Sequence, residues 1–318
     1  MRLNTWQQVA LNTFTYLAAL IIFFPIMWML LTSFKTEREA FNFPPSLIPV
    51  FSFSADEPAL DENGEPIVEE VVEDEGYSIF FDATLNNYQR AIFGQGVDEI
   101  TWEAFWDGDF APPLINTLWI TLISTLVALV LGIPAAYALA FKPDKRSDFT
   151  LLWLISTRML PPAGVIVPLF FLARDLNLLD TRMGMIIIYT GMNVPLVIWM
   201  MRSFLLDVPY EILEAGRMDG VSLIQEFRYL VLPLVAPGLF ATALLCMIFT
   251  WNEFFFAFNI AKSNAEPLTV YISSFKTGRG QFIALMSAAS TLAVLPVVIA
   301  GWFAQKQLVQ GLTMGAVK

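Results

Sequence analysis

Histidine is absent from this chain of 318 residues, and Cys246 is its only cysteine. One cysteine cannot form a disulfide within the chain, and without histidine the usual Cys/His metal clusters are excluded. The sequence also lacks the Gly-x4-Gly-Lys-Ser/Thr loop that cradles nucleotide phosphates. We therefore expect no metal site and no bound cofactor in this chain. A hydrolytic enzyme is poorly supported, because the sequence offers no convergent set of catalytic residues.

Charged residues are also scarce, at 15% of the chain, whereas about a quarter of the residues are charged in soluble domains. Hydrophobic residues make up 56%, and the mean hydropathy is +0.61. A run of about 20 apolar residues can span a bilayer as a helix. Six such runs occur, at residues 10–33, 113–141, 149–173, 183–205, 230–259 and 281–304. The sequence therefore predicts an all-α, polytopic membrane protein with six transmembrane helices. The first run is too long for a signal peptide, so we expect it to remain as an anchor.

The short loops predict how these helices cross the membrane. Positive residues favour the cytoplasmic side, and they gather after the second run and around the loop after the fourth run: Lys142, Lys145 and Arg146, then Arg202, Arg217 and Arg228. Both termini are then expected in the cytoplasm. The predicted divisions are a first helix at 1–36, an extracytoplasmic segment at 37–112, a five-helix core at 113–305 with a cytoplasmic loop at about 206–229, and a cytoplasmic tail at 306–318.

The net charge of −11 is concentrated in the predicted extracytoplasmic segment. Carboxylates crowd residues 69–75, and Pro58, Gly64 and Pro66 in the same stretch favour a solvated, partly disordered excursion. A specific contact with a partner is the alternative. Four aromatic residues follow among further acids, and they are expected to form a lateral interfacial helix or a contact for an outer partner: Trp102, Phe105, Trp106 and Phe110.

A polar island at residues 214–220, Glu-Ala-Gly-Arg-Met-Asp-Gly, separates the fourth and fifth apolar runs. Pro209 is tolerated in the first turn of a helix, and Gly220 can adopt the left-handed conformation that ends one. Ser222 and Gln225 have the spacing of a capping box, which starts a second helix. The pattern therefore predicts a helix-turn-helix. Its small residues would let another protein approach the backbone closely, while its first glutamate stays available for a charged partner.

With Leu-Val-Leu-Pro at residues 230–233, separated from Gly220 by nine residues, the island resembles the "EAA" loop of binding-protein-dependent ABC importer permeases. That loop reads Glu-Ala-Ala, three residues, Gly, nine residues, Ile-x-Leu-Pro. Gly216 replaces the second alanine, and Leu230 replaces the isoleucine. The long form at residues 214–237 is similar to the carbohydrate-uptake branch of the family. Further matches occur at residues 31–35, 251–254 and 307–318.

The resemblance implies the type I permease fold of ABC importers and a transport subunit rather than an enzyme. It implies a heterodimer with a second permease chain, two ATPase subunits that bind ATP and Mg, and an extracytoplasmic solute-binding protein. The complex would lie at the plasma (inner) membrane of a bacterial-type cell, and it would not bind nucleic acid. It assigns coupling to the ATPase to Glu214, Ala215, Gly216, Arg217, Asp219, Gly220, Leu232 and Pro233. It also implies that the tail, with Gly311, Leu312, Thr313 and Gly315, enters the cleft between the ATPase subunits; a frayed terminus is the alternative.

Polar residues inside the apolar runs are costly in lipid and normally face a cavity or another helix. Arg158 lies about nine residues into the third run, or roughly 14 Å at the helical rise, which is near the middle of the bilayer. Pro161 and Pro162 break the helix nearby, so Arg158 is a candidate for the substrate path; a structural pair with a carboxylate of the companion subunit is equally sensible. For Asn193 in the fourth run, a hydrogen bond between helices stands beside a path-lining role.

Trp251, Asn252 and Glu253 in the fifth run complete the candidate translocation path. An aromatic ring can pack on the apolar face of a pyranose or polyol, and amide and carboxylate groups bind hydroxyls. An aromatic belt at the membrane interface is the alternative, given the phenylalanines that follow.

We therefore predict an ATP-driven permease subunit for a sugar or sugar alcohol, embedded in the lipid bilayer. Residues 156–161, 251–256 and 273–277 look most similar to the mannitol and sorbitol permeases. Another small solute (a sulfonated sugar, a disaccharide or a glycerol phosphate) is the alternative, and a secondary transporter is a further one. In such families one of the two permeases can hold all the sugar contacts, so this chain could shape the gate without touching the solute.

Overall fold

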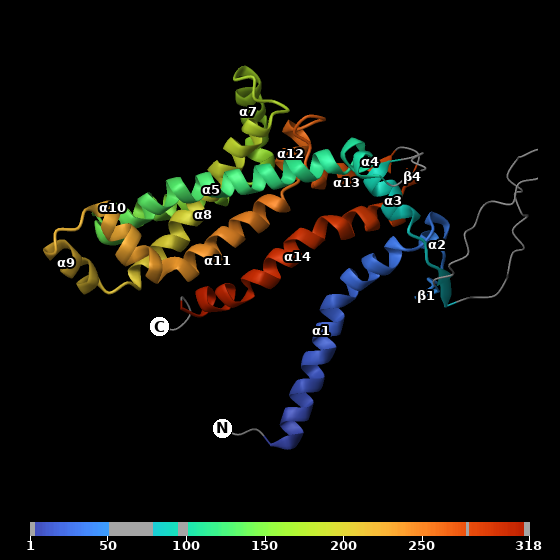
Figure 1. Ribbon diagram of the computed structural model, residues 1–318, viewed down its shortest axis with the longest axis horizontal. Coiled ribbons are helices and arrows are strands. Elements are labelled where there is room, and N and C mark those ends of the chain that lie inside the picture. The colour runs from blue at the N-terminus through green and yellow to red at the C-terminus, as the bar shows by residue number, and fades with distance from the viewer. Residues whose placement is uncertain (1–3, 51–78, 95–100, 278–279, 315–318) are drawn as a thin grey trace, which may run out of the picture. The chain divides into compact units, whose positions relative to one another are not determined.

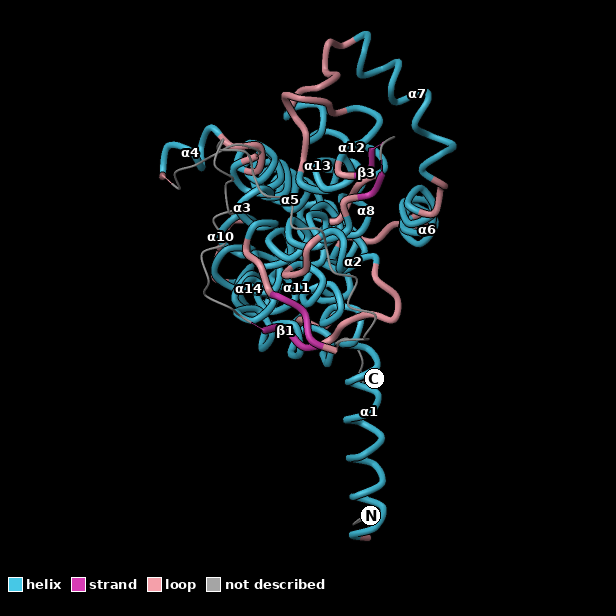
Figure 2. Tube along the Cα trace, turned by 90° about the vertical axis from the view of Figure 1, so that its right-hand side faces the viewer, coloured by secondary structure: helices cyan, strands magenta, loops and turns pink. Residues whose placement is uncertain are grey.

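The computed structural model describes residues 4–50, 79–94, 101–277 and 280–314. The chain divides into two compact units, one formed by residues 1–109 and 274–292 and the other by residues 110–273 and 293–318. The acidic run at 69–75 lies outside the described residues, as do Pro58, Gly64 and Pro66. Helices, drawn in cyan in Figure 2, make up most of the described chain.

The first unit contains short elements around the end of one long helix. Its elements are α1 (Thr5–Ser33), α2 (Glu37–Phe41), β1 (Ile48–Val50), β2 (Phe80–Asp82), α3 (Asn86–Phe93), α4 (Trp102–Asp107), β3 (Lys276–Thr277), β4 (Gly280–Gln281) and the first part of α14 (Ile283–Met314). Strand β1 pairs in parallel with β2, and β3 pairs in antiparallel fashion with β4. Three of the four aromatic residues that were expected to form a lateral interfacial helix or a partner contact lie in α4, where the rings of Trp102, Phe105 and Trp106 contact one another.

A buried lysine organises the segment after α1. The ammonium of Lys35, which is 2% exposed, donates to the carbonyl of Ser46 and lies 5.1 Å from the ring centres of both Trp28 and Phe81. Burial lowers the pKa of Lys35, and the negative charge of Glu39 opposes that shift. The two aromatic faces and the carbonyl partly replace the lost water, which explains how a lysine is tolerated there.

The second unit is a helical bundle. It contains α5 (Ala111–Phe141), α6 (Ser147–Arg158), α7 (Pro162–Asp175), α8 (Arg182–Leu206), α9 (Tyr210–Met218), α10 (Leu223–Gln225), the π-helix η1 (Glu226–Val231), α11 (Leu232–Trp251), α12 (Phe255–Ile260), α13 (Leu268–Ser274) and the remainder of α14. The long helices α5, α8 and α11 lie side by side, and α9 and α10 lie together at one end of them (Figure 1).

Small residues let α5 and α8 approach closely. A Cβ atom added at Gly132 of α5 would lie 2.6 Å from a methyl carbon of Val197 in α8. Ala128 and Ala136, four residues to either side on the same face, are fully buried. The core that results combines small and aliphatic side chains of α5, α8 and α11, as expected where helices associate by close packing rather than by hydrophobic exclusion from water.

The predicted all-α, multi-span fold is confirmed. Five stretches in the described residues are long and apolar enough to cross a membrane: Trp6–Ser33, Ala111–Phe141, Arg182–Leu206, Leu223–Trp251 and Ile283–Trp302. The pair α6 and α7 becomes a sixth if it is counted as one broken span. Its two helices are bent by 87°, because Pro161 and Pro162 interrupt the chain where the sequence predicted a break.

The limits of the fifth span differ from those predicted, whereas those of the sixth agree. The fifth run was expected to continue to residue 259, but α11 ends at Trp251 and the separate helix α12 starts at Phe255. The sixth span, Ile283–Trp302, agrees with the predicted run at 281–304, and the helix α14 continues beyond it to Met314. Residues 306–314 of the predicted tail therefore have a helical backbone, and residues 315–318 lie outside the described chain.

Candidate functional site

The predicted helix-turn-helix is confirmed as a hairpin formed by α9, α10 and η1, residues 210–231, which we call the α9–η1 hairpin. Gly220 has a φ of 78°, the left-handed conformation that turns the chain after α9. Ser222 and Gln225 form the predicted capping box at the start of α10. On the outer face of α9, Glu214 and Ala215 are exposed, and Met218 is 89% exposed. The hairpin thus presents an accessible surface on α9.

Gly216 has a different role from the one that its sequence context suggested. It is buried inside the α9–η1 hairpin, and a Cβ atom there would lie 2.4 Å from Cδ1 of Leu230 and 3.3 Å from Cγ2 of Val221. Its lack of a side chain therefore lets η1 pack against α9. Of the two small residues, only Ala215 is exposed to an approaching partner.

A buried carboxylate joins the two arms of the α9–η1 hairpin. Glu226 is fully buried, and Arg217 donates to it twice, from Nε to Oε2 at 2.8 Å and from Nη2 to Oε1 at 3.0 Å. The hydroxyl of Tyr137 in α5 donates to Oε1 as well. Hydrogen bonds from Arg217 to Glu226 are the main reason why the pKa of Arg217 is raised. No sequence pattern pointed to Glu226, because an acid in a short polar helix is ordinary.

The remaining coupling candidates lie at helix ends. Asp219 is the exposed C-terminal cap of α9, and Leu232 and Pro233 open α11, where proline is tolerated in the first turn. In the predicted tail, Gly311, Leu312 and Thr313 belong to the helical backbone of α14, and Gly315 lies outside the described residues.

Two of the predicted path residues, Arg158 and Asn193, are brought together in the second unit. The Nη1 atom of Arg158, at the end of α6, donates to the carbonyl of Met192 at 2.8 Å and lies 3.5 Å from Oδ1 of Asn193. The guanidinium also stacks over Phe249 of α11, 4.7 Å from the ring centre. Asn193 is buried, and its amide donates to Thr250 at 2.8 Å. Within the described ranges, no carboxylate pairs with Arg158.

The other three predicted path residues have different environments. Trp251 is 9% exposed and donates through Nε1 to the carbonyl of Ala293. Asn252 is exposed. The carboxylate of Glu253 accepts a hydrogen bond from the hydroxyl of Tyr189 at 2.6 Å. It also accepts hydrogen bonds from two backbone N–H groups at the start of α12, those of Phe256 at 3.0 Å and Ala257 at 3.2 Å. Glu253 thus caps α12, because it satisfies N–H groups that have no partner within that helix.

An acidic clamp that the sequence did not reveal joins two loops at the opposite end of the bundle from α9. Asp180, in the loop between α7 and α8, accepts the backbone N–H groups of Lys262, Asn264 and Ala265 at 2.7–3.2 Å, and the Asn264 side chain as well. Burial alone would raise the pKa of Asp180, but these donors hold it below its usual value. The pKa of Glu266 is raised by burial and by the charge of Asp180.

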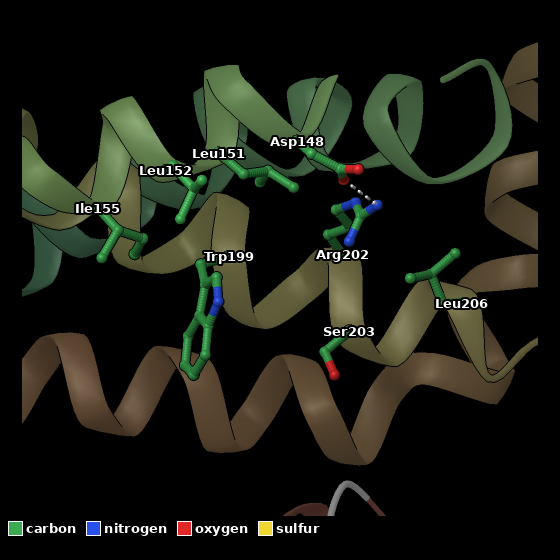
Figure 3. A pocket seen from close by; sticks show the side chains of 8 residues that line it. All are labelled: Asp148, Leu151, Leu152, Ile155, Trp199, Arg202, Ser203 and Leu206. Atoms are coloured by element: carbon green, nitrogen blue, oxygen red, sulfur yellow. Dashed lines mark ion pairs between the residues drawn. The ribbon is translucent and has the colours of Figure 1, made fainter. Parts of the chain in front are cut away.

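An open cavity of about 520 Å³ lies between α6 and α8, and Figure 3 shows the side chains that line it. Asp148 and Arg202 form a 3.6 Å ion pair at one end, and Trp199 lies farther along the wall. The other lining residues are Leu151, Leu152, Ile155, Ser203 and Leu206. None of the predicted path residues lines this cavity, so it is separate from the Arg158 and Asn193 cluster. Among the described residues, no cluster of three acidic or cysteine side chains that could hold a metal ion occurs.

The sequence matches a known protein family and several named relatives. Residues 128–314 match the family described as "Binding-protein-dependent transport system inner membrane component". The chain is 36% identical to the trehalose transport system permease protein SugB of Mycobacterium tuberculosis over 68% of this chain and 81% of the relative. It is 28% identical to the trehalose/maltose transport system permease protein MalG of Thermococcus litoralis over 100% of this chain and 99% of the relative.

The fold is also similar to a solved structure. A chain in the crystal structure of a bacterial ABC transporter involved in the import of the acidic polysaccharide alginate matches with a TM-score of 0.66. The two chains are 20% identical, and the match covers 96% of this chain and 99% of the other.

Proposed function

Because the chain belongs to the family of binding-protein-dependent transport system inner membrane components, we propose that it is the permease subunit of an ATP-driven importer for a sugar or sugar alcohol. The observation that carries the proposal is the match of residues 128–314 to this family, together with similarity to permeases named for trehalose and for trehalose/maltose. ABC permeases are transport components rather than enzymes.

The solute class has two candidates. A sugar alcohol is favoured by the likeness of residues 156–161, 251–256 and 273–277 to mannitol and sorbitol permeases. A disaccharide is favoured by the names of the relatives SugB and MalG. Both solutes present many hydroxyl groups and a partly apolar face, so the same polar and aromatic side chains suit either.

The partners follow from the family. The permease pairs with a second permease chain, and two ATPase subunits bind ATP and Mg on the cytoplasmic side, where both termini of this chain also lie. A solute-binding protein delivers the solute from outside. The exposed face of α9 with Glu214 and Ala215 is the surface for an ATPase subunit. Because α9 follows α8 and η1 leads directly into α11, a movement of the α9–η1 hairpin acts on both helices.

Arg158 and Asn193 are the best-supported residues of the translocation path. They meet at the break between α6 and α7, where the helix loses its own hydrogen-bond partners. An arginine at this depth is costly in lipid and is satisfied by a carbonyl, an aromatic ring and an amide. Hydroxyl groups of a passing solute can compete for the same donors, which suits weak, transient binding.

The test is uptake into proteoliposomes that contain this chain with its companion permease, its ATPase and its binding protein. We expect ATP-dependent accumulation of one solute from a panel of mannitol, sorbitol, trehalose and maltose, and none when the ATPase is left out. The affinities of the binding protein for the same panel should follow the same order. Accumulation without ATP, driven by an ion gradient, would instead identify a secondary transporter.

A further inference from the structure

The buried carboxylate of Glu226 lies where three parts of the second unit meet. Glu226 begins η1, Arg217 belongs to the last turn of α9, and Tyr137 projects from α5. Glu226 and Tyr137 are 89 residues apart in the chain. Since a π-helix is rare and is often found at functional sites, the position of this acid at the first residue of η1 calls for a role beyond local folding.

The three side chains form a connected polar cluster, from which Arg217 also donates to the hydroxyl of Tyr210. Both carboxylate oxygens of Glu226 are used, one by Nε of Arg217 and the other by Nη2 of Arg217 and the hydroxyl of Tyr137. Such a two-pronged arginine–carboxylate pair fixes orientation as well as distance. The Tyr137 ring is held in turn by Phe141 and Phe227, whose ring centres lie 4.9 and 6.2 Å away.

This cluster supplies a link between the α9–η1 hairpin and α5. The chain itself connects the hairpin only to α8 and α11. The turn of the hairpin contains Gly220, which has no neighbouring atom within 4 Å of a Cβ position and therefore little packing to resist bending. Without a contact that joins its two arms, a displacement of α9 would bend the hairpin at this turn and would not reach α5.

We propose that Arg217, Glu226 and Tyr137 act as a brace that passes movement of a docked ATPase from the α9–η1 hairpin to α5, making Glu226 a positioning residue for energy coupling. The inference rests on the proposed function, since it needs an ATPase on the outer face of α9. Breaking a buried charged contact by removing one partner is costly, so the brace stays closed while the hairpin moves as one body with α5.

Three substitutions weaken the brace to different degrees. Glu226→Gln keeps the shape and removes the charge, and Arg217→Lys keeps the charge and removes the fork. Tyr137→Phe removes only the hydroxyl that reaches from α5 to Glu226. In the full reconstituted complex, we expect each variant to retain the ATPase while the number of solutes imported per ATP hydrolysed falls. For Glu226→Gln, the number of solutes imported per ATP hydrolysed should fall by about fivefold or more, which is the lower end of typical coupling between sites.

Tyr137→Phe is the decisive variant, because it leaves the ion pair within the hairpin intact. A brace to α5 predicts a lower import-to-ATP ratio for Tyr137→Phe, whereas a purely local role in folding predicts a normal ratio. The exchanged pair, Arg217→Glu with Glu226→Arg, should recover part of the ratio lost by either single change. Arg228→Gln is the control, since Arg228 is exposed on η1 and stacks on its neighbour Tyr229.

The outcomes separate the brace from the proposed function. A normal import-to-ATP ratio in Tyr137→Phe and Arg217→Lys, with equal amounts of assembled complex, overturns the brace and leaves the permease function standing. The brace is also overturned if import in the variants falls only in proportion to the amount of assembled complex. If the unaltered complex shows no ATP-dependent import and does not retain an ATPase, the proposed function itself fails. If Glu226→Gln does not assemble, the other two variants still decide the question.

Discussion

At the scale of single residues, the acids of the second unit divide by what their carboxylates bind. Glu214 is exposed and is available to a partner, whereas Glu226, Glu253 and Asp180 are each held by several donors within the chain. The three held acids stabilise loops and helix starts. Substitutions at these positions should therefore be read first as changes in local structure and only then as changes in solute or partner binding.

Asp180 should make the stability of the protein depend on pH in the acidic range. Its pKa is lowered in the folded protein, so its contribution is complete above its ordinary value of 3.8 and is lost as pH falls through the folded value. Asp180→Asn should lower stability at pH 7 by about 1–3 kcal/mol, because backbone donors lose a charged acceptor. Thermal unfolding at pH 7 and pH 3 measures this. The control is Asp175→Asn, because Asp175 is 65% exposed and pairs with its exposed neighbour Arg174; this change should alter stability little.

Glu266 should make stability depend on pH in the opposite direction. Burial and the charge of Asp180 raise its pKa, so its favourable contribution holds below the ordinary pKa of 4.5 and is lost as pH rises through the folded value. Glu266→Gln should therefore stabilise the protein at pH 7 and have little effect at pH 3. Thermal unfolding at the two pH values checks this, and a loss of stability at pH 7 would contradict it.

Gly220 is needed for its backbone conformation rather than for space. With a φ of 78° and nothing within 4 Å of a Cβ position, the site tolerates bulk but disfavours a left-handed L-residue. Gly220→Ala should cost about 1–2 kcal/mol, and Gly220→Asn less, because asparagine adopts this conformation more readily. Unfolding in detergent compares the two. Equal stability of all three proteins would show that the turn carries no strain.

At the scale of elements, breaks in the long helices bring polar groups into the bundle. The break between α6 and α7 places Arg158 beside Asn193, and the break after α11 lets Glu253 cap α12. Glu253 was predicted to line the translocation path, and that role stays a prediction beside its observed role as a cap. Since Asn252 is exposed and Glu253 is half-buried, the two neighbours offer a direct comparison.

Thiol labelling tests the path. In a background in which buried Cys246 is replaced by alanine, Asn252→Cys should react with a membrane-impermeant reagent in the nucleotide-free complex, and Glu253→Cys more slowly. Glu253→Leu should impair uptake more than Glu253→Gln, because leucine removes the cap of α12 as well as the charge. If neither cysteine reacts in any nucleotide state and Glu253→Leu transports normally, both residues serve packing alone.

The end of α14 offers a second test at this scale. Deletion of residues 309–318 removes the final part of α14 and the four residues beyond it. If this end enters the cleft between the ATPase subunits, the shortened protein should insert normally but hydrolyse ATP without importing solute. ATP hydrolysed per solute imported measures the effect, and a wild-type ratio would favour a frayed terminus.

At the scale of the whole molecule, the α9–η1 hairpin is where force from a partner would enter the bundle. Glu214→Lys replaces attraction with repulsion on the exposed face and should weaken uptake and retention of the ATPase. Gly216→Trp should abolish uptake by a different route, because the indole at this buried position forces α9 away from the Leu230 side chain. Uptake at wild-type rates in both variants, at equal expression, would exclude the hairpin as the point of entry.

The sequence by itself determined the features that arise from neighbouring residues. The apolar runs predicted the spans, Pro161 and Pro162 predicted the break in the third one, and the order Gly220, Ser222 and Gln225 predicted the hairpin turn and cap. Each is a local property, because helix length, a left-handed turn and a capping box involve residues within a few positions of one another.

Only the tertiary structure decided which polar groups are satisfied and by what. Glu226 meets Tyr137 across 89 residues, and Asp180 meets Asn264 across 84. Buried acids must find donors, but the sequence does not say which distant segment supplies them. For the same reason, the buried position of Gly216 against Leu230 and the capping role of Glu253 emerged only once the helices were packed.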